Sequence, residues 1–326
     1  MQTSWYTTVK VIIVLTFVVA LAPSYVEAQS ITREQVGGAD TGDFVVGPGK
    51  VELTLNPGEY RVVEMTVTNR LGEPRQFNID VEDAAGSDDP NRPVVLLGSD
   101  RGPYTLKDYL SVPETSFVLE AGQRARIPVT VSIPENAEPG GRYGSVLVTT
   151  TTLPEEGGAV SGDARPSSAL VTRIGTLFFI TTPGEGMYDG VLEDFSTIPD
   201  TWFKQSGPIS FSVLYRNNGS IHLNPYGEIN ITNMMGEVVG FVELDPWYAL
   251  PQSLRFREVR WDREWLFGLY TATIALNRGY DDIVDTQSVT FWVMPWQVIV
   301  PGTLGIILVV WVLRFLFTRF EFRRKS

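Results

Sequence analysis

Short runs in which apolar and polar residues alternate constrain the fold of this chain more than any other feature. Val51, Leu53 and Leu55 would share one face of a strand, and residues 56–58, Asn-Pro-Gly, are typical of a turn. Similar runs recur through residues 44–294 at a spacing of roughly 8–12 residues, which is typical of antiparallel sandwiches. The pattern predicts an all-β chain whose strands bury one face and expose the other.

The alternating runs fall into two groups, which predict two tandem immunoglobulin-like β-sandwiches. We expect the first over residues 44–182 and the second over residues 190–294. Residues 154–169 are poor in bulky apolar side chains. We interpret them as a long loop within the first domain, because the run at residues 170–180 looks like a strand that returns to that sandwich.

The N-terminal segment, residues 1–28, has the layout of a secretory signal peptide. Lys10 precedes the run at residues 11–22, in which only Thr16 is polar, and Ala28 supplies a small residue for cleavage. An apolar run of this length is too short to span a bilayer. An uncleaved N-terminal anchor is the alternative.

A second apolar segment, residues 297–317, is long enough to form a transmembrane helix, because about 20 helical residues match the hydrocarbon core. Trp292 and Trp296 precede it, where an aromatic belt is expected. By the positive-inside rule, the basic tail at residues 318–326 is cytoplasmic. The sequence thus predicts a single-pass protein of the cell membrane with an extracellular N-terminal ectodomain.

Charge and residue usage exclude several classes of function. The chain has 26 Lys and Arg against 38 Asp and Glu, whereas nucleic-acid binding needs clustered basic residues, so we expect no nucleic-acid partner. Without Cys and with one His, it has no disulfides, thiol nucleophiles or two-imidazole centres. No motif around His222 would make it a base, and we interpret it as a polar residue at a strand edge. The chain is not expected to be an enzyme.

Four aromatic residues of the second domain form the candidate ligand-binding site. Trp247 and Tyr248 are adjacent in an expected loop, and Trp261 and Trp265 flank a polar stretch. Exposed rings with carboxylates and guanidinium groups nearby suit sugar stacking or a protein hot spot. The alternative is that Trp261 packs in the core and Trp265 covers one end of the sandwich.

Acidic residues are concentrated in a short stretch of the first domain, which comprises Asp80, Glu82, Asp83, Asp88 and Asp89. Hard oxygen ligands of this kind suit calcium, which takes roughly six to eight oxygens. Calcium is therefore the hypothesis for this cluster, and we expect no other cofactor.

Two tyrosines stand at equivalent places in the two halves. Tyr143 and Tyr270 each follow a turn glycine by two residues at the start of a late strand. A tyrosine there resembles a tyrosine corner, whose ring is buried and whose hydroxyl returns to the backbone. We interpret both as structural.

Residues 55–59 (Leu-Asn-Pro-Gly-Glu), 117–123 (Phe-Val-Leu-Glu-Ala-Gly-Gln) and 138–145 (Glu-Pro-Gly-Gly-Arg-Tyr-Gly-Ser) resemble the N-terminal domain of the WxL-interacting protein family of bacterial surface proteins. The second half, with residues 215–225, adds to this resemblance. It implies a signal peptide, two immunoglobulin-like domains, a transmembrane helix and a basic tail, with peptidoglycan binding by the first domain. The acidic, Pro-rich residues 84–112 have no place in that pattern.

We therefore expect a non-catalytic, membrane-anchored cell-surface protein whose immunoglobulin-like domains bind cell-wall polymer, other surface proteins, or both. The alternative is a membrane-tethered chaperone or scaffold for secreted or surface subunits, which would use an edge strand of its sandwiches.

Overall fold

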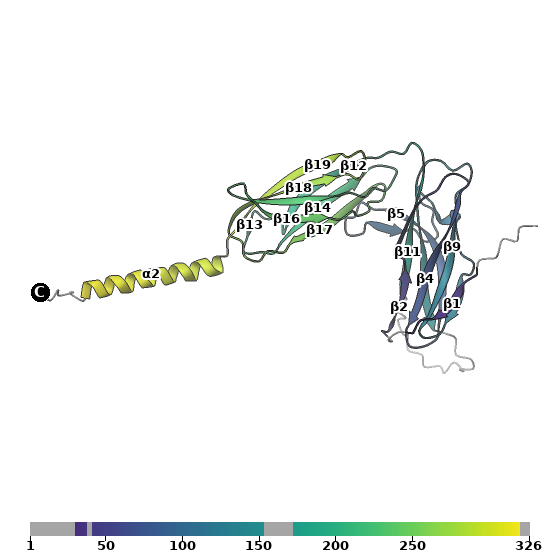
Figure 1. Ribbon diagram of the computed structural model, residues 1–326, viewed down its shortest axis with the longest axis horizontal. Coiled ribbons are helices and arrows are strands. Elements are labelled where there is room, and N and C mark those ends of the chain that lie inside the picture. Colours follow the sequence, from purple (N-terminus) through teal and green to yellow (C-terminus); the bar gives the residue numbers. More distant parts are fainter. Residues whose placement is uncertain (1–29, 38–40, 153–171, 320–326) are drawn as a thin grey trace, which may run out of the picture.

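The computed structural model describes residues 30–37, 41–152 and 172–319. The predicted signal peptide, the loop expected at residues 154–169 and most of the predicted tail lie outside the described residues. Two β-sandwich domains follow each other along the chain, and one helix extends from the second (Figure 1). The predicted all-β fold with a C-terminal apolar helix is confirmed.

The first domain consists of two sheets. One has the strand order β1-β9-β4-β2, with β7 also paired to β9, and the other has the order β3-β11-β10-β5-β6, with β8 also paired to β5. The bounds are β1 Thr32–Gln35, β2 Asp43–Gly47, β3 Lys50–Thr54, β4 Tyr60–Arg70, β5 Arg75–Gly86, β6 Val94–Leu96, 3-10 helix η1 Lys107–Tyr109, β7 Leu110–Ser111, β8 Ser116–Leu119, β9 Gln123–Ser132, β10 Gly140–Thr152 and β11 Arg173–Thr182.

The core of the first domain comes from the inward-facing members of the alternating strands. In β9, Ile127, Val129 and Val131 are fully buried while the residues between them are partly exposed. Phe77 of β5 lies 5.9 Å from Phe117, measured between ring centroids. The domain begins earlier than the predicted residue 44, because β1 pairs with β9.

The second domain is also a sandwich, with the strand orders β12-β14-β17 and β13-β19-β18-β15-β16. Alternate residues of β14 are buried along its whole length, as the sequence pattern requires. The bounds are β12 Gly190–Ile198, β13 Phe203–Lys204, β14 Ile209–Asn217, β15 Tyr226–Asn233, β16 Val238–Leu244, β17 Ser253–Trp261, β18 Gly268–Asn277 and β19 Val284–Val293.

The helix α2, Trp296–Arg319, occupies the place of the predicted transmembrane segment. Its window Ile299–Leu316 has a mean hydropathy of 2.2, and none of that window is buried against the rest of the protein. Figure 1 shows the helix projecting away from the second sandwich. One helix of this length and composition can cross a membrane.

A buried asparagine ends a strand in each domain. The amide of Asn69, near the end of β4, donates to the carbonyl of Leu119 at 3.0 Å. Asn217, the last residue of β14, donates to the carbonyls of Ile221 and Ala249, both at 2.9 Å. Both asparagines are fully buried. Each amide donates to backbone carbonyls of a neighbouring segment, so its own buried polar atoms are hydrogen-bonded inside the protein.

Asn69→Ala tests this role. The substitution leaves the buried carbonyl of Leu119 without its side-chain donor, so we expect the unfolding free energy to fall by about 1–3 kcal/mol. Urea denaturation measures the change. The exposed Asn91→Ala is the matched control, with an expected change within about 0.5 kcal/mol. Equal stabilities for the two variants would contradict the assigned role.

Candidate functional site at the domain junction

Three polar side chains meet where the two domains touch. Tyr143 lies on β10, Glu52 on β3, and His222 in the loop between β14 and β15. The Tyr143 hydroxyl accepts a hydrogen bond from the backbone N–H of His222 at 2.7 Å and lies 3.2 Å from its Nδ1. Nε2 of His222 lies 2.6 Å from Oε1 of Glu52. The single histidine therefore bonds to two different strands of the first domain.

One arrangement of protons satisfies every contact of this cluster. In it, the Tyr143 phenol accepts from the His222 N–H and donates its own proton to Nδ1, and Nε2 carries the proton that is donated to Glu52. Both ring nitrogens are thus engaged. The side chains of Tyr143 and His222 are also buried. In this arrangement the imidazole has no free nitrogen with which to take a proton from a substrate.

Apolar side chains from both domains surround the cluster. The ring of Phe179 on β11 meets Tyr143 edge-on at 5.4 Å and Tyr248 of the second domain at 5.1 Å. Leu250 of the second domain and Ala84 of the first are buried in the same cluster. The junction is therefore a small core of its own, separate from the cores of the two sandwiches.

A second contact brings the two backbones together beside this cluster. A Cβ on Gly86, the last residue of β5, would stand 2.4 Å from the carbonyl oxygen of Pro251, so only glycine fits there. The carbonyl of the next residue, Ser87, accepts a hydrogen bond from the N–H of Leu254 at 2.9 Å. The end of β5 thus abuts the start of β17, and Figure 1 shows β5 extending toward the second domain.

The cluster of Tyr143, His222 and Glu52 holds one carboxylate and one neutral phenol at neutral pH. Burial raises the pKa of Glu52, but hydrogen bonds from His222 and Lys50 outweigh burial and lower this pKa to about 2. Burial raises the pKa of Tyr143 above its ordinary value. The negative charge of Glu52 is therefore matched by donors from both domains.

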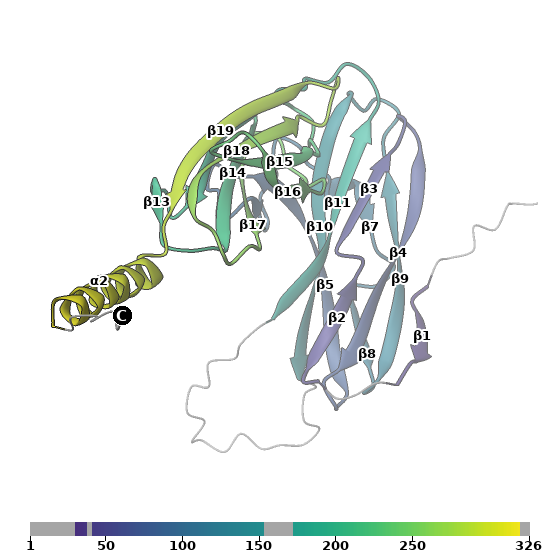
Figure 2. The ribbon, with the colours of Figure 1, turned by 60° about the vertical axis from the view of Figure 1, so that its left-hand side comes forward.

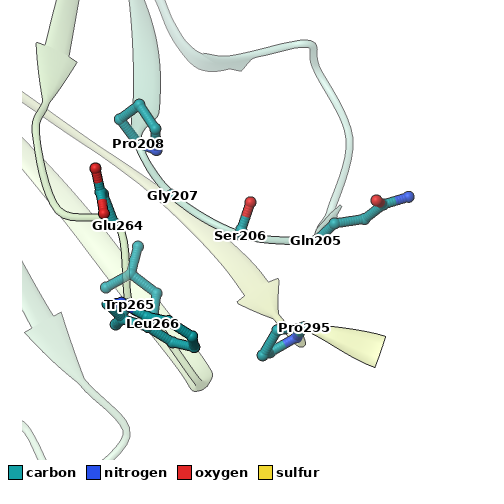
Figure 3. A pocket seen from close by; sticks show the side chains of 8 residues that line it. All are labelled: Gln205, Ser206, Gly207, Pro208, Glu264, Trp265, Leu266 and Pro295. Carbon is teal, nitrogen blue, oxygen red and sulfur yellow. The ribbon is translucent and has the colours of Figure 1, made fainter. Parts of the chain in front are cut away.

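The four predicted ligand-binding aromatics do not form one site. Trp261 is buried in the second core and Trp247 packs against that core, under the guanidinium of Arg257 at 4.7 Å. Tyr248 belongs to the junction. Trp265 is 75% exposed at the far end of the domain, where it lines a pocket of about 370 Å³ (Figure 3).

Asp83, from the predicted calcium cluster, organises a loop. Its carboxylate is fully buried and accepts from the backbone N–H groups of Gly102, Leu106 and Lys107, at 2.8 to 3.1 Å. These residues belong to the acidic, Pro-rich insertion that matched no part of the family pattern. The buried carboxylate therefore holds the insertion against β5.

The other acids of that cluster have separate surroundings. Glu82 pairs with Arg173, and Asp88 pairs with Arg216 of the second domain at 2.9 Å. Asp80 and Asp89 are exposed. Across residues 30–37, 41–152 and 172–319, no three His, Asp or Glu side chains are placed to hold a metal ion. Glu82, Asp83 and Asp88 are engaged in hydrogen bonds or ion pairs of their own, so this arrangement does not form the predicted calcium site.

Sequence reasoning missed the junction itself. The ring of Tyr143 is buried as a tyrosine corner would be, but its hydroxyl bonds to His222, 79 residues away, and not to its own domain. His222 is a buried junction residue, not the strand-edge residue that we expected. Tyr270 does return its hydroxyl to nearby backbone, at Phe267. The residues around Tyr143 and Tyr270 follow the same pattern, so the sequence near each tyrosine does not reveal which hydroxyl bonds to the other domain.

No protein-family model and no curated protein matches the sequence. Among solved structures, the class 5 fimbriae chaperone CfaA is similar at 12% identity and a TM-score of 0.36, over 76% of this chain and 99% of that chain. The E. coli chaperone DraB is 14% identical, with a TM-score of 0.32, over 77% of this chain and 95% of its own. A chain of the CsuC-CsuE complex from Acinetobacter baumannii is 9% identical, with a TM-score of 0.34, over 77% and 99%.

Structural similarity at these sequence identities and TM-scores does not indicate what this chain binds. The resemblance to the WxL-interacting family stays a prediction, because no family model matches.

Acid should weaken the junction through Glu52. Its pKa in the folded protein, about 2, lies below the ordinary value of 4.5, so its stabilising contribution is complete above pH 4.5 and is lost as the pH falls toward 2. Because Glu52 is more than a third exposed, solvent screening limits this contribution to about 1 kcal/mol. Urea denaturation of Glu52→Gln should therefore show a smaller loss of unfolding free energy than wild type over this pH range. If the unfolding free energies of wild type and Glu52→Gln fall in parallel with pH, Glu52 does not stabilise the junction in this way.

Proposed function

We propose that this chain is a non-catalytic, membrane-tethered scaffold that holds an exported or surface protein by pairing with an open sheet edge. The edge is that of β17, which pairs with β14 on one side and has no strand on the other among the described residues. Figure 1 shows β17 along the side of the second domain that lies inside the angle between the two domains. A nine-residue open edge is a ready template for another chain.

The observation that carries this proposal is the bond between Ser87 and β17. The N–H of Leu254 points away from β14 and donates to the carbonyl of Ser87. Because backbone direction alternates along a strand, the N–H groups of Phe256, Glu258 and Arg260 point the same way. The first domain thus occupies the first position of this edge and leaves the next positions open for a partner strand.

The surroundings of the edge favour a protein over a sugar polymer. The guanidinium groups of Arg255 and Arg257 lie 4.8 and 4.7 Å above the rings of Tyr248 and Trp247, so these rings are covered. Trp261 is buried. These three aromatic rings therefore do not form one exposed surface on which a sugar could stack. The outward-pointing N–H groups of β17, by contrast, remain available to pair with a strand.

The helix α2 supplies the tether in this proposal. We infer that it spans the cell membrane with the two sandwiches outside and the basic tail inside, following the positive-inside rule. The absence of catalysis in this proposal is supported by the single histidine, whose two ring nitrogens are both engaged at the junction.

Glu258→Pro tests the edge. Proline removes one outward-pointing N–H. An edge strand tolerates proline at a position whose N–H points to solvent and makes no hydrogen bond within the sheet. We expect the protein that co-purifies with full-length wild type from membranes of the producing cells to be lost with Glu258→Pro. Glu258→Ala keeps the N–H and is the matched control, so it should retain that protein.

Two outcomes would overturn the proposal. One is equal recovery of partner protein by Glu258→Pro and Glu258→Ala. The other is that the full-length chain retains purified cell wall but co-purifies with no partner protein. That result would favour the polymer-binding alternative.

A further inference from the structure

Large apolar side chains are exposed at one end of the second domain. Five of them are between 68 and 80% exposed: Trp202, Met234, Met235, Trp265 and Phe267. They come from three separate segments, namely the turn before β13, the turn between β15 and β16, and the loop between β17 and β18. Exposed apolar groups gathered in one place mark a contact surface.

Strand registers and contacts place all three segments at the same end. Met234 Sδ lies 4.0 Å from the position of a Cβ on Gly268, the first residue of β18. The carbonyl of Trp202 accepts from the N–H of Trp292, near the end of β19. Trp265 lines the same pocket as Pro295, and Figure 3 shows the two side chains on neighbouring walls of it.

This end of the domain is also the end from which the helix leaves. β19 ends at Val293 and α2 begins at Trp296, so only two residues separate the sandwich from the helix. Two residues span at most about 7 Å. Each headgroup layer of a bilayer is roughly 5–7 Å thick. With Ile299–Leu316 in the hydrocarbon core, this end of the domain comes within reach of the headgroup layer.

We propose that this end of the second domain rests in the interfacial layer of the membrane, with the exposed Trp, Phe and Met side chains inserted among the lipid headgroups. The proposal rests on α2 being the membrane anchor. Aromatic rings with one apolar and one polar end are favoured at this depth. The exposed faces of these side chains would gain apolar neighbours from lipid.

The lipid contact is apolar and not electrostatic. Acidic and basic groups are mixed at this end, comprising Asp200, Glu237, Asp262, Glu264, Lys204, Arg260 and Arg263. Arg260 pairs with Asp262 at 2.6 Å, and the Lys204 ammonium donates to the carbonyl of Pro199. No excess of basic groups draws this surface to anionic lipid, so zwitterionic phosphatidylcholine is the expected surface.

The absence of native cysteine makes the test direct. Full-length Met235→Cys and Phe267→Cys, each labelled with a fluorophore, are reconstituted into phosphatidylcholine vesicles that contain lipids spin-labelled near the headgroup. Tyr226→Cys is the matched control, because Tyr226 is exposed and pairs with Asn277 at the opposite end of the domain. We expect several-fold stronger quenching at positions 235 and 267 than at 226, unchanged at high salt.

Equal quenching at the three positions, in protein that floats with the vesicles, would overturn this proposal and leave the anchor intact. Failure of the labelled proteins to float with vesicles would instead overturn the anchor on which it rests. Quenching at 235 and 267 that appears only with anionic lipid would contradict the apolar contact.

Discussion

The hydrogen-bonded cluster of Tyr143, His222 and Glu52 is the contact on which the arrangement of the two domains depends. Each buried polar atom of the cluster finds its partner in the other domain. Separation of the domains would leave these groups unpaired or rehydrated and would expose Phe179 and Leu250. Domains joined by a short linker move relative to each other unless their interface opposes it, and here the interface does.

A fixed junction gives the other surfaces defined positions. The strand β17 begins at the junction, where Leu254 meets Ser87, and ends near the loop of Trp265, at the end of the domain from which α2 leaves. The open edge therefore runs from the first domain toward the helix (Figures 1 and 2). In the proposed function, a partner strand on that edge would lie between the first domain and the membrane that α2 is inferred to span. The proposed tether and the open edge are thus joined to the junction in one connected body.

The sequence predicted the strands and the helix because their signals are local. Alternation marked β14 along its length, and the apolar run at residues 297–317 became α2. The junction was not predictable, because spacing does not reveal which residues meet across domains. Tyr143 had the local pattern of a tyrosine corner but bonds to His222. Asp83 matched a calcium ligand by residue type, yet it accepts three backbone hydrogen bonds in a buried place.

The distance between the two domains tests the central claim most directly. Spin labels at Val118→Cys in the first domain and Phe241→Cys in the second, both exposed, report this distance by double electron–electron resonance. A fixed junction predicts one narrow distance distribution in wild-type background, and a shifted or broadened one when Gly86→Val forces the backbones apart. A broad distribution without Gly86→Val, unchanged by that substitution, would contradict a fixed junction.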